Sequence, residues 1–179
     1  MSWKTIHSDK VFTSPYVVVH KDKVELPGGV QIDDFYTVTV PDAAAIVALT
    51  SEKQILLKCE YRYSCQEETV EIPAGTFDKK ETNPLDVAKR ELLEETGYIS
   101  NQWTYLCSTR EHTAKLTNRM HIFLAENCEK VETQHLDETE QIELITVTFD
   151  KAIEMVMNNE ISCSTSAYGI LRAARMMGV

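Results

Sequence analysis

Three glutamates near the middle of the chain have the residue type and spacing of a metal-binding set. Glu91 and Glu94 are three residues apart, and Glu91 and Glu95 are four apart. In a helix these spacings place all three carboxylates on one face, where like charges repel. A divalent cation would remove that repulsion, and oxygen-only ligands favour a hard ion such as Mg2+ or Mn2+. The alternative interpretation is a solvated acidic helix face, because glutamates are mostly exposed in proteins.

The residues around these glutamates predict the helix that would hold them. Pro84 suits a first helical turn, where its missing N–H costs nothing, and Gly97 stands where a glycine commonly ends a helix. Between them, apolar residues recur at helical spacing and form one stripe, made of Leu85, Ala88, Leu92 and Leu93.

Residues 75–98 resemble the Nudix box, Gly-x5-Glu-x7-Arg-Glu-U-x-Glu-Glu-x-Gly-U, in which U is a bulky aliphatic residue. Two positions depart from that pattern: eight residues separate Glu81 from Arg90, and Tyr98 replaces the last aliphatic residue. The extra residue falls before the helix, where a loop absorbs an insertion. The matching positions are Gly75, Glu81, Arg90, Glu91, Leu92, Glu94, Glu95 and Gly97.

The resemblance implies a fold, a cofactor and a set of ligands. The fold is an α/β/α sandwich around a mixed sheet, and the cofactor is Mg2+ or Mn2+. The implied ligands are the carboxylates of Glu91, Glu94 and Glu95 together with the backbone carbonyl of Ala74. Arg90 is expected to orient a neighbouring glutamate, as groups behind metal ligands commonly do. Its alternative role is a surface ion pair, worth under about 1 kcal/mol.

The general base is expected outside the box. In Nudix hydrolases that act on ADP-ribose and sugar nucleotides, the base often comes from a later loop with the pattern Glu-x-Ile/Val-Glu. Residues 140–143 match that pattern, so Glu140 is the first candidate and Glu138 the second. The alternative for both residues is a solvated acidic loop.

The same resemblance supplies candidate substrate-binding residues. Arg62 closes a Glu-Tyr-Arg run that resembles the Gln-Tyr-Arg of the subfamily, whose arginine contacts the nucleotide. Trp3 and Phe35 stand where relatives stack an aromatic ring on the base; alternatively, Phe35 is a core residue and Trp3 a surface one. Relatives that prefer ADP-ribose usually carry a proline about 16 residues after the box, and none occurs around Ala114.

The expected activity is therefore hydrolysis of the pyrophosphate bond in ADP-ribose or a related nucleoside diphosphate sugar. The products are a nucleoside monophosphate and a sugar phosphate. Hydrolysis of nucleoside triphosphates is a second hypothesis, disfavoured by the N-terminal extension. A nucleotide-sensing module without catalysis is a third, disfavoured because all three box glutamates are intact.

The chain divides by pattern into residues 1–41, a small β unit, and residues 42–179, the Nudix domain. Strands are predicted at 16–20, 30–40, 43–49, 54–61, 69–74, 102–109, 120–125 and 142–147, and further helices at 150–157 and 164–177. Residues 110–119 are interpreted as a polar, mobile loop. The few strands of residues 1–41 are not enough to form a hydrophobic core by themselves. The resemblance favours a homodimer in which residues 1–41 of one chain line the nucleotide pocket of its partner.

Net charge and cysteine content argue against several kinds of binding partner and structural site. The net charge of −10 argues against binding to a nucleic-acid backbone or an anionic membrane surface. The five cysteines form no Cys-x-x-Cys pair, which indicates neither a disulfide framework nor a zinc site. No apolar signal region or run of 18 apolar residues is present. These features favour a cytoplasmic protein with a small-molecule substrate.

Overall fold

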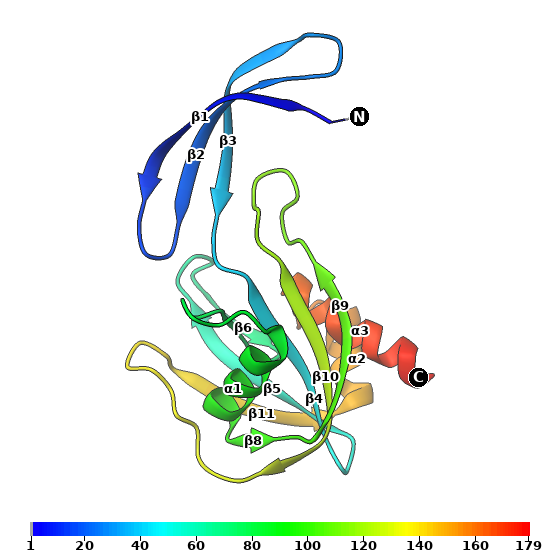
Figure 1. Cartoon of the computed structure of the whole chain (residues 1–179). Coiled ribbons are helices and arrows are strands. Elements are labelled where there is room, and N and C mark those ends of the chain that lie inside the picture. Colours follow the sequence, from blue (N-terminus) through cyan, green and yellow to red (C-terminus); the bar gives the residue numbers. More distant parts are fainter. Residues whose placement is uncertain (1) are drawn as a thin grey trace. The chain divides into compact units, whose positions relative to one another are not determined.

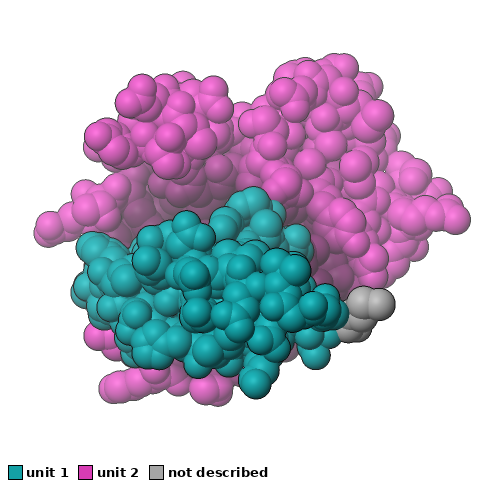
Figure 2. Space-filling view, turned by 90° about the horizontal axis from the view of Figure 1, so that it is seen from above, with its two compact units in different colours: residues 1–42, 110–119 teal, residues 43–109, 120–179 magenta. Residues whose placement is uncertain are grey.

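The computed structural model describes residues 2–179 (Figure 1). The chain forms two compact units, coloured separately in Figure 2. Unit 1 comprises the chain up to Asp42 together with residues 110–119, and unit 2 comprises residues 43–109 and 120–179. Within the described residues, no helix is long and apolar enough to cross a membrane.

Unit 1 is a three-stranded antiparallel sheet in the order β1-β2-β3, as the sequence predicts for a small N-terminal β unit. Gly28 and Gly29 have φ angles of 103° and 88° in the turn between β2 and β3, a conformation that glycine adopts at little cost. The strand expected at 16–20 begins only at Val18. The predicted ranges omit the first strand, because its sequence is largely polar. The bounds are β1 Lys4–Thr13, β2 Val18–Glu25 and β3 Gln31–Thr39.

Residues 110–119 are not the free loop that their polarity suggests. The backbone N–H of Val38 donates to the Lys115 carbonyl at 2.9 Å, and the N–H of Thr117 donates back to the Val38 carbonyl at 3.1 Å. Leu116 forms a parallel bridge with Val38. These bonds attach the segment to the edge of β3, where the backbone groups of an edge strand need partners.

Unit 2 is built on one mixed sheet of eight strands. Its main path runs β11-β5-β4-β10-β8, while β6 pairs with β5, β7 with β4, and β9 with β10. The β4–β10 pair is parallel and the others are antiparallel. The strands are β4 Ala43–Thr50, β5 Gln54–Arg62, β6 Glu67–Glu71, β7 Ala74–Thr76, β8 Tyr98–Ile99, β9 Gln102–Thr109, β10 Met120–Lys130 and β11 Ile142–Thr148.

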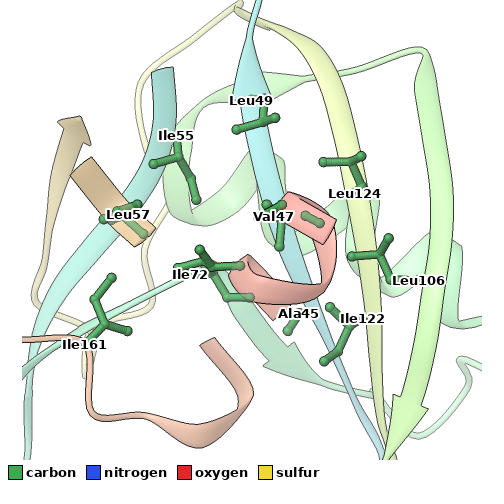
Figure 3. Packing of buried hydrophobic residues seen from close by; sticks show 14 of the residues in the cluster. Ala45, Val47, Leu49, Ile55, Leu57, Ile72, Leu106, Ile122, Leu124 and Ile161 are labelled. Carbon is green, nitrogen blue, oxygen red and sulfur yellow. The ribbon is translucent and has the colours of Figure 1, made fainter. Parts of the chain in front are cut away.

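Helices cover both faces of this sheet, which confirms the expected α/β/α sandwich. Helix α1 (Pro84–Thr96) packs through Val87, Ala88 and Leu92 on one face. Helices α2 (Phe149–Met157) and α3 (Ser164–Met177) cover the opposite face. Strand β4 contributes to both cores because successive side chains alternate in direction. Figure 3 shows the second core, with side chains that include Ala45, Val47, Leu49, Ile72 and Ile122.

One break within the sheet positions the candidate site. A single strand was predicted at 69–74, but it divides at Pro73 into β6 and β7. Proline has no N–H to donate to a ladder, although the Pro73 carbonyl still accepts from the N–H of Ile46 at 2.9 Å. The short β7 then pairs with β4 and brings Ala74 and Gly75 beneath α1.

Candidate active site

Helix α1 has defined ends that orient its glutamates. Asn83 caps its start, where the side-chain Oδ1 accepts from the N–H of Leu85 at 3.2 Å, and Pro84 follows in the first turn. Gly97 ends the helix at φ 74°, and its N–H donates to the Leu93 carbonyl at 2.8 Å. A Cβ added at Gly97 would lie 2.1 Å from the Glu132 carbonyl oxygen. The end of the helix therefore also requires a residue without a side chain.

Arg90 lies at the centre of a network that joins three acidic residues. Its Nε and Nη2 donate to the two carboxylate oxygens of Glu81, both at 3.0 Å. Its Nη1 lies 2.7 Å from Glu91 Oε1 and donates to Glu94 Oε2 at 2.8 Å. Its Nη2 also donates to the Thr76 carbonyl at 3.0 Å. The extra residue relative to the box pattern thus lies before α1, and Glu81 still reaches Arg90.

Glu95 forms an ion pair with a different cation, the buried ammonium of Lys58. Nζ of Lys58 donates to Glu95 Oε1 and, at 3.3 Å, to the carbonyl of Ala74. The other oxygen, Glu95 Oε2, accepts from the N–H of Ala74 at 2.9 Å. Burial raises the pKa of Glu95, and the Lys58 ammonium opposes that rise. Sequence reasoning missed Lys58; the available signal was a lysine inside the apolar run of β5.

Gly75 brings the backbone of β7 directly against Glu91. A Cβ built on Gly75 would lie 2.0 Å from both Cδ and Oε1 of Glu91, so any side chain there would collide with the carboxylate. The site therefore gathers Glu91, Glu95 and the Ala74 carbonyl around β7. Glu94, on the same helix face, points to Arg90 and is 42% exposed at its side chain.

The donor types fit a hard divalent cation, since carboxylates and a carbonyl are the ligands that Mg2+ and Mn2+ prefer. In residues 2–179, however, no three acidic, histidine or cysteine side chains already converge as a metal cluster. The reason is local: Arg90 holds Glu91 and Glu94, while Lys58 holds Glu95. A metal ion at this face would therefore compete with Arg90 and Lys58 for these carboxylates.

The surroundings of Glu91 change the acidity of its carboxyl group. It is 7% exposed. Burial raises its pKa to about 7, the positive charge of Arg90 opposes that rise, and the negative charge of Glu95 adds to it. Its ordinary value is 4.5, so the folded protein binds this proton more tightly than the unfolded chain does.

We expect the metal-free protein to lose stability relative to a Glu91→Gln variant as pH rises. The contribution of the raised pKa is fully present below about pH 4.5 and is lost as pH passes through about 7. The loss amounts to at most about 3 kcal/mol. Urea unfolding of both proteins in a chelator, at about pH 5 and about pH 8, measures it. A free-energy difference between the two proteins that is the same at both pH values would contradict the prediction.

Arg62, the candidate substrate arginine, lies at the end of β5 within a second ion-pair network. Nε donates to Glu71 Oε1 at 3.1 Å and Nη2 to Glu71 Oε2 at 2.6 Å, while Nη1 lies 3.1 Å from Glu60 Oε2. Burial acts to raise the pKa of Glu71, but the hydrogen bonds from Arg62 and Thr69 hold it below the usual range. The side chain of Arg62 is 35% exposed.

Glu140, the candidate base, lies in the loop before β11. Its backbone N–H donates to the Asp137 carbonyl at 2.9 Å, and its Oε2 accepts from the N–H of Asp137 at 3.0 Å. The carboxylate of Glu140 thus accepts a hydrogen bond from within its own loop. Its negative charge contributes to the raised pKa of Glu95. Glu138, the second candidate, is exposed in the same loop.

Trp3 and Phe35, the candidate stacking residues, lie together in unit 1. Their ring centroids are 5.5 Å apart in an edge-to-face arrangement. Nζ of Lys115 lies 4.5 Å from the centroid of Phe35, within the range of a cation–π interaction. Trp3 is 49% exposed, so the pair is not a closed core.

Comparison with known proteins gives two family matches along the chain. A NUDIX domain profile matches residues 39–162, and a profile for the nucleoside diphosphate sugar hydrolase N-terminal domain matches residues 3–38. A solved structure described as an ADP compounds hydrolase superposes with a TM-score of 0.85 over 99% of this chain and 95% of its own, at 18% identity. That likeness shows the fold.

Two curated relatives span nearly the whole chain. The methanol dehydrogenase activator of Bacillus methanolicus is 34% identical over 168 residues, and the ADP-ribose pyrophosphatase of Bacillus subtilis (strain 168) is 33% identical over 168 residues. Each alignment covers 93% of this chain and 90% of the relative. The NUDIX match covers more than half of the sequence and includes the glutamate-bearing helix α1. The chain therefore belongs to the NUDIX family and is a Nudix hydrolase with an N-terminal domain of the nucleoside diphosphate sugar hydrolase type.

Proposed function

We propose that this protein hydrolyses the pyrophosphate bond of ADP-ribose or a related nucleoside diphosphate sugar, giving a nucleoside monophosphate and a sugar phosphate. One observation carries the proposal: Glu91, Glu95 and the Ala74 carbonyl gather at β7, with Glu94 beside them, inside a NUDIX domain. The substrate class is supported by the N-terminal domain match and by the relative named ADP-ribose pyrophosphatase.

The proposed cofactor is Mg2+, or Mn2+, at this glutamate face. Its candidate ligands are the carboxylates of Glu91, Glu94 and Glu95 and the carbonyl of Ala74. When bound, it supplies charge stabilisation to the phosphate oxygens and the leaving group. Arg90 is proposed to orient these carboxylates, because it contacts both Glu91 and Glu94.

The remaining roles fall to residues outside the box. Glu140 is proposed to accept the proton of the attacking water. Its negative charge acts on the glutamate face, because it contributes to the raised pKa of Glu95. Arg62 is proposed to donate to the substrate's phosphate oxygens, for which a guanidinium is well suited. Trp3 and Phe35 are proposed to stack on the nucleobase, which gives affinity without much base discrimination.

A product screen tests the proposal. Full-length protein is incubated with ADP-ribose, other nucleotide sugars, dinucleoside polyphosphates and nucleoside triphosphates, with Mg2+ and then with Mn2+. We expect a nucleoside monophosphate and a sugar phosphate from the sugar nucleotides, detected by chromatography. Preferential cleavage of triphosphates would favour the alternative hypothesis of triphosphate hydrolysis. Tight nucleotide binding without any turnover would favour a sensing module.

The relative named methanol dehydrogenase activator supports a second candidate role. Under it, this chain would raise the activity of a methanol dehydrogenase in addition to hydrolysing a nucleotide. Adding the protein to such a dehydrogenase, with a catalytically disabled Glu94→Gln variant in parallel, tests the role. No effect of either protein on the dehydrogenase rate would remove it.

We further propose a cytoplasmic homodimer. All five cysteines are free, as a reducing compartment favours. Strand β1 is exposed along its whole length, and it displays three apolar side chains that are each more than two-fifths exposed, Ile6, Val11 and Phe12. Exposed apolar residues at such density are typical of an interface, and closed twofold dimers are the commonest oligomers.

Light scattering on the purified protein is expected to report about twice the chain mass of 20.4 kDa. Deleting residues 1–41 should then yield a monomer that still binds metal but has lost affinity for the nucleotide, because Trp3 and Phe35 are removed. A monodisperse monomer of the intact chain with full activity would contradict the shared-site dimer and leave the box chemistry unaffected.

A further inference from the structure

Gln134 connects the loop that carries the candidate bases to the helix that carries the box glutamates. Its side-chain Nε2 donates to two backbone carbonyls, that of Glu95 at 2.7 Å and that of Ile142 at 3.3 Å. A side-chain amide nitrogen has two N–H donors, so this pair of bonds uses both. Glu95 lies in the last turn of α1, and Ile142 is the first residue of β11. One side chain therefore bonds to two elements that are far apart in the sequence.

The bond to the Glu95 carbonyl is one of several between this loop and the end of α1. The last carbonyls of a helix have no partner within the helix. The backbone N–H of His135 donates to the Glu94 carbonyl at 2.8 Å. The N–H of Val131 donates to the Gly97 carbonyl at 2.9 Å. The loop thus supplies donors to the backbone of the residues whose carboxylates are the proposed metal ligands, and it leaves those carboxylates to the metal.

The second bond of Gln134 fixes the far end of the loop to the sheet. Ile142 is 8% exposed and begins β11, which pairs with β5. Residues 136–141, between the two anchored ends, include both candidate bases, Glu138 and Glu140. The two anchors therefore limit where these carboxylates can lie relative to the box glutamates.

We infer that Gln134 is a positioning residue for the hydrolysis, because its two hydrogen bonds hold both ends of the loop that carries Glu138 and Glu140 against the metal-bearing helix. This role rests on the proposed function and leaves its ligand set unchanged, since Gln134 bonds to the backbone carbonyl of Glu95 and not to the carboxylate. Gln134 acts through the loop carboxylates and touches no substrate atom. Displacing a catalytic group by about 1 Å can lower the rate by about 100-fold.

The test compares full-length wild type with Gln134→Met, which keeps the length of the side chain and removes both donors. The substrate is the nucleotide that the product screen shows to be cleaved fastest, at saturating Mg2+. We expect kcat to fall at least about tenfold, a part of the roughly 100- to 10,000-fold that a positioned base contributes. KM should change by less than about twofold, because the substrate contacts remain. An unchanged kcat in Gln134→Met overturns the inference.

Gln141→Met is the matched control, because Gln141 is an exposed glutamine of the same loop. It should keep the kcat and KM of wild type. If Gln134→Met does not fold, Gln134→Asn takes its place. Asparagine keeps the amide but is one methylene shorter, so kcat is again expected to fall while KM stays. An unchanged kcat in folded Gln134→Asn overturns the inference in the same way.

Two further measurements separate positioning from a purely structural role. Titration with Mn2+ alone, followed by electron paramagnetic resonance, should give the same affinity in wild type and Gln134→Met. A fall in affinity that parallels the fall in kcat would show that Gln134 acts through the metal ligands, and it overturns the inference. In a Glu138→Gln/Glu140→Gln background, Gln134→Met should lower kcat no further, because residues that act as a unit are not additive. A further fall of the full size also overturns it.

Failure of the proposed function has a different signature. In that case wild type cleaves no nucleotide in the product screen, and the role of Gln134 falls with it. An active wild type whose kcat does not depend on Gln134 contradicts the positioning role alone and leaves the proposed function standing.

Discussion

Replacing Glu94 by glutamine is expected to lower turnover by a factor of about 100 or more, equivalent to about 2.7 kcal/mol of lost transition-state stabilisation. The carboxylate lies on the glutamate face beside Glu91, and its side chain is 42% exposed and therefore accessible to solvent and to a dissolved ion. Glutamine keeps the shape of the side chain but removes the charge that binds a hard cation. The rate at which the nucleoside monophosphate forms from ADP-ribose at saturating Mg2+, followed by chromatography, measures the change.

The fold of this variant should survive, because the ion pair that Glu94 makes with Arg90 is partly exposed and worth under about 1 kcal/mol. Glu154→Gln is the matched control, since Glu154 is also helical, is 67% exposed and pairs with Lys151. The control should keep wild-type turnover. A folded Glu94→Gln variant with unchanged activity would refute the assignment of metal binding to this face.

Replacing Gly75 by alanine is expected to lower turnover by about 100-fold with little loss of stability. The new methyl group would lie 2.0 Å from the carboxylate of Glu91, which must then move away from β7. Displacing a catalytic group by about 1 Å typically has a cost of this size. Gly75 does not have a positive φ, and the group that must move is the end of a flexible side chain, so the backbone is not strained.

A double-variant cycle shows whether Gly75 acts through Glu91. If it does, Gly75→Ala combined with Glu91→Gln should be about as active as Glu91→Gln alone, because residues in contact are not additive. Thermal unfolding of each variant separates activity from stability. Full additivity of the two effects on turnover would show that the glycine acts by another route.

The glutamate helix is predictable from its local sequence. Pro84, the apolar stripe and Gly97 specify α1 between Pro84 and Thr96 without reference to the rest of the chain. Helical spacing then places the three box carboxylates on one face, because that geometry depends only on residues three and four apart. The strand β9 and the helix α3 likewise have the bounds that their own patterns predict, 102–109 and 164–177.

Elements that depend on distant partners were predicted less well. β10 continues to Lys130, beyond the predicted end at Ala125, because its last residues pair with the short β8. β7 and β8 are three and two residues long, too short to show a periodic pattern of their own. Residues 110–119 join unit 1 through backbone bonds to Val38, which side-chain polarity does not reveal.

The sequence by itself determined the candidate site residues: three glutamates on a capped helix, an arginine beside them and a glycine before them. Only the tertiary structure decided which cation each carboxylate meets. Glu91 and Glu94 contact Arg90, their neighbour in the helix, whereas Glu95 contacts Lys58, which is 37 residues away on β5. The physical reason is that spacing along a helix sets the face, while burial and charge pairing depend on strands that folding brings beneath that face.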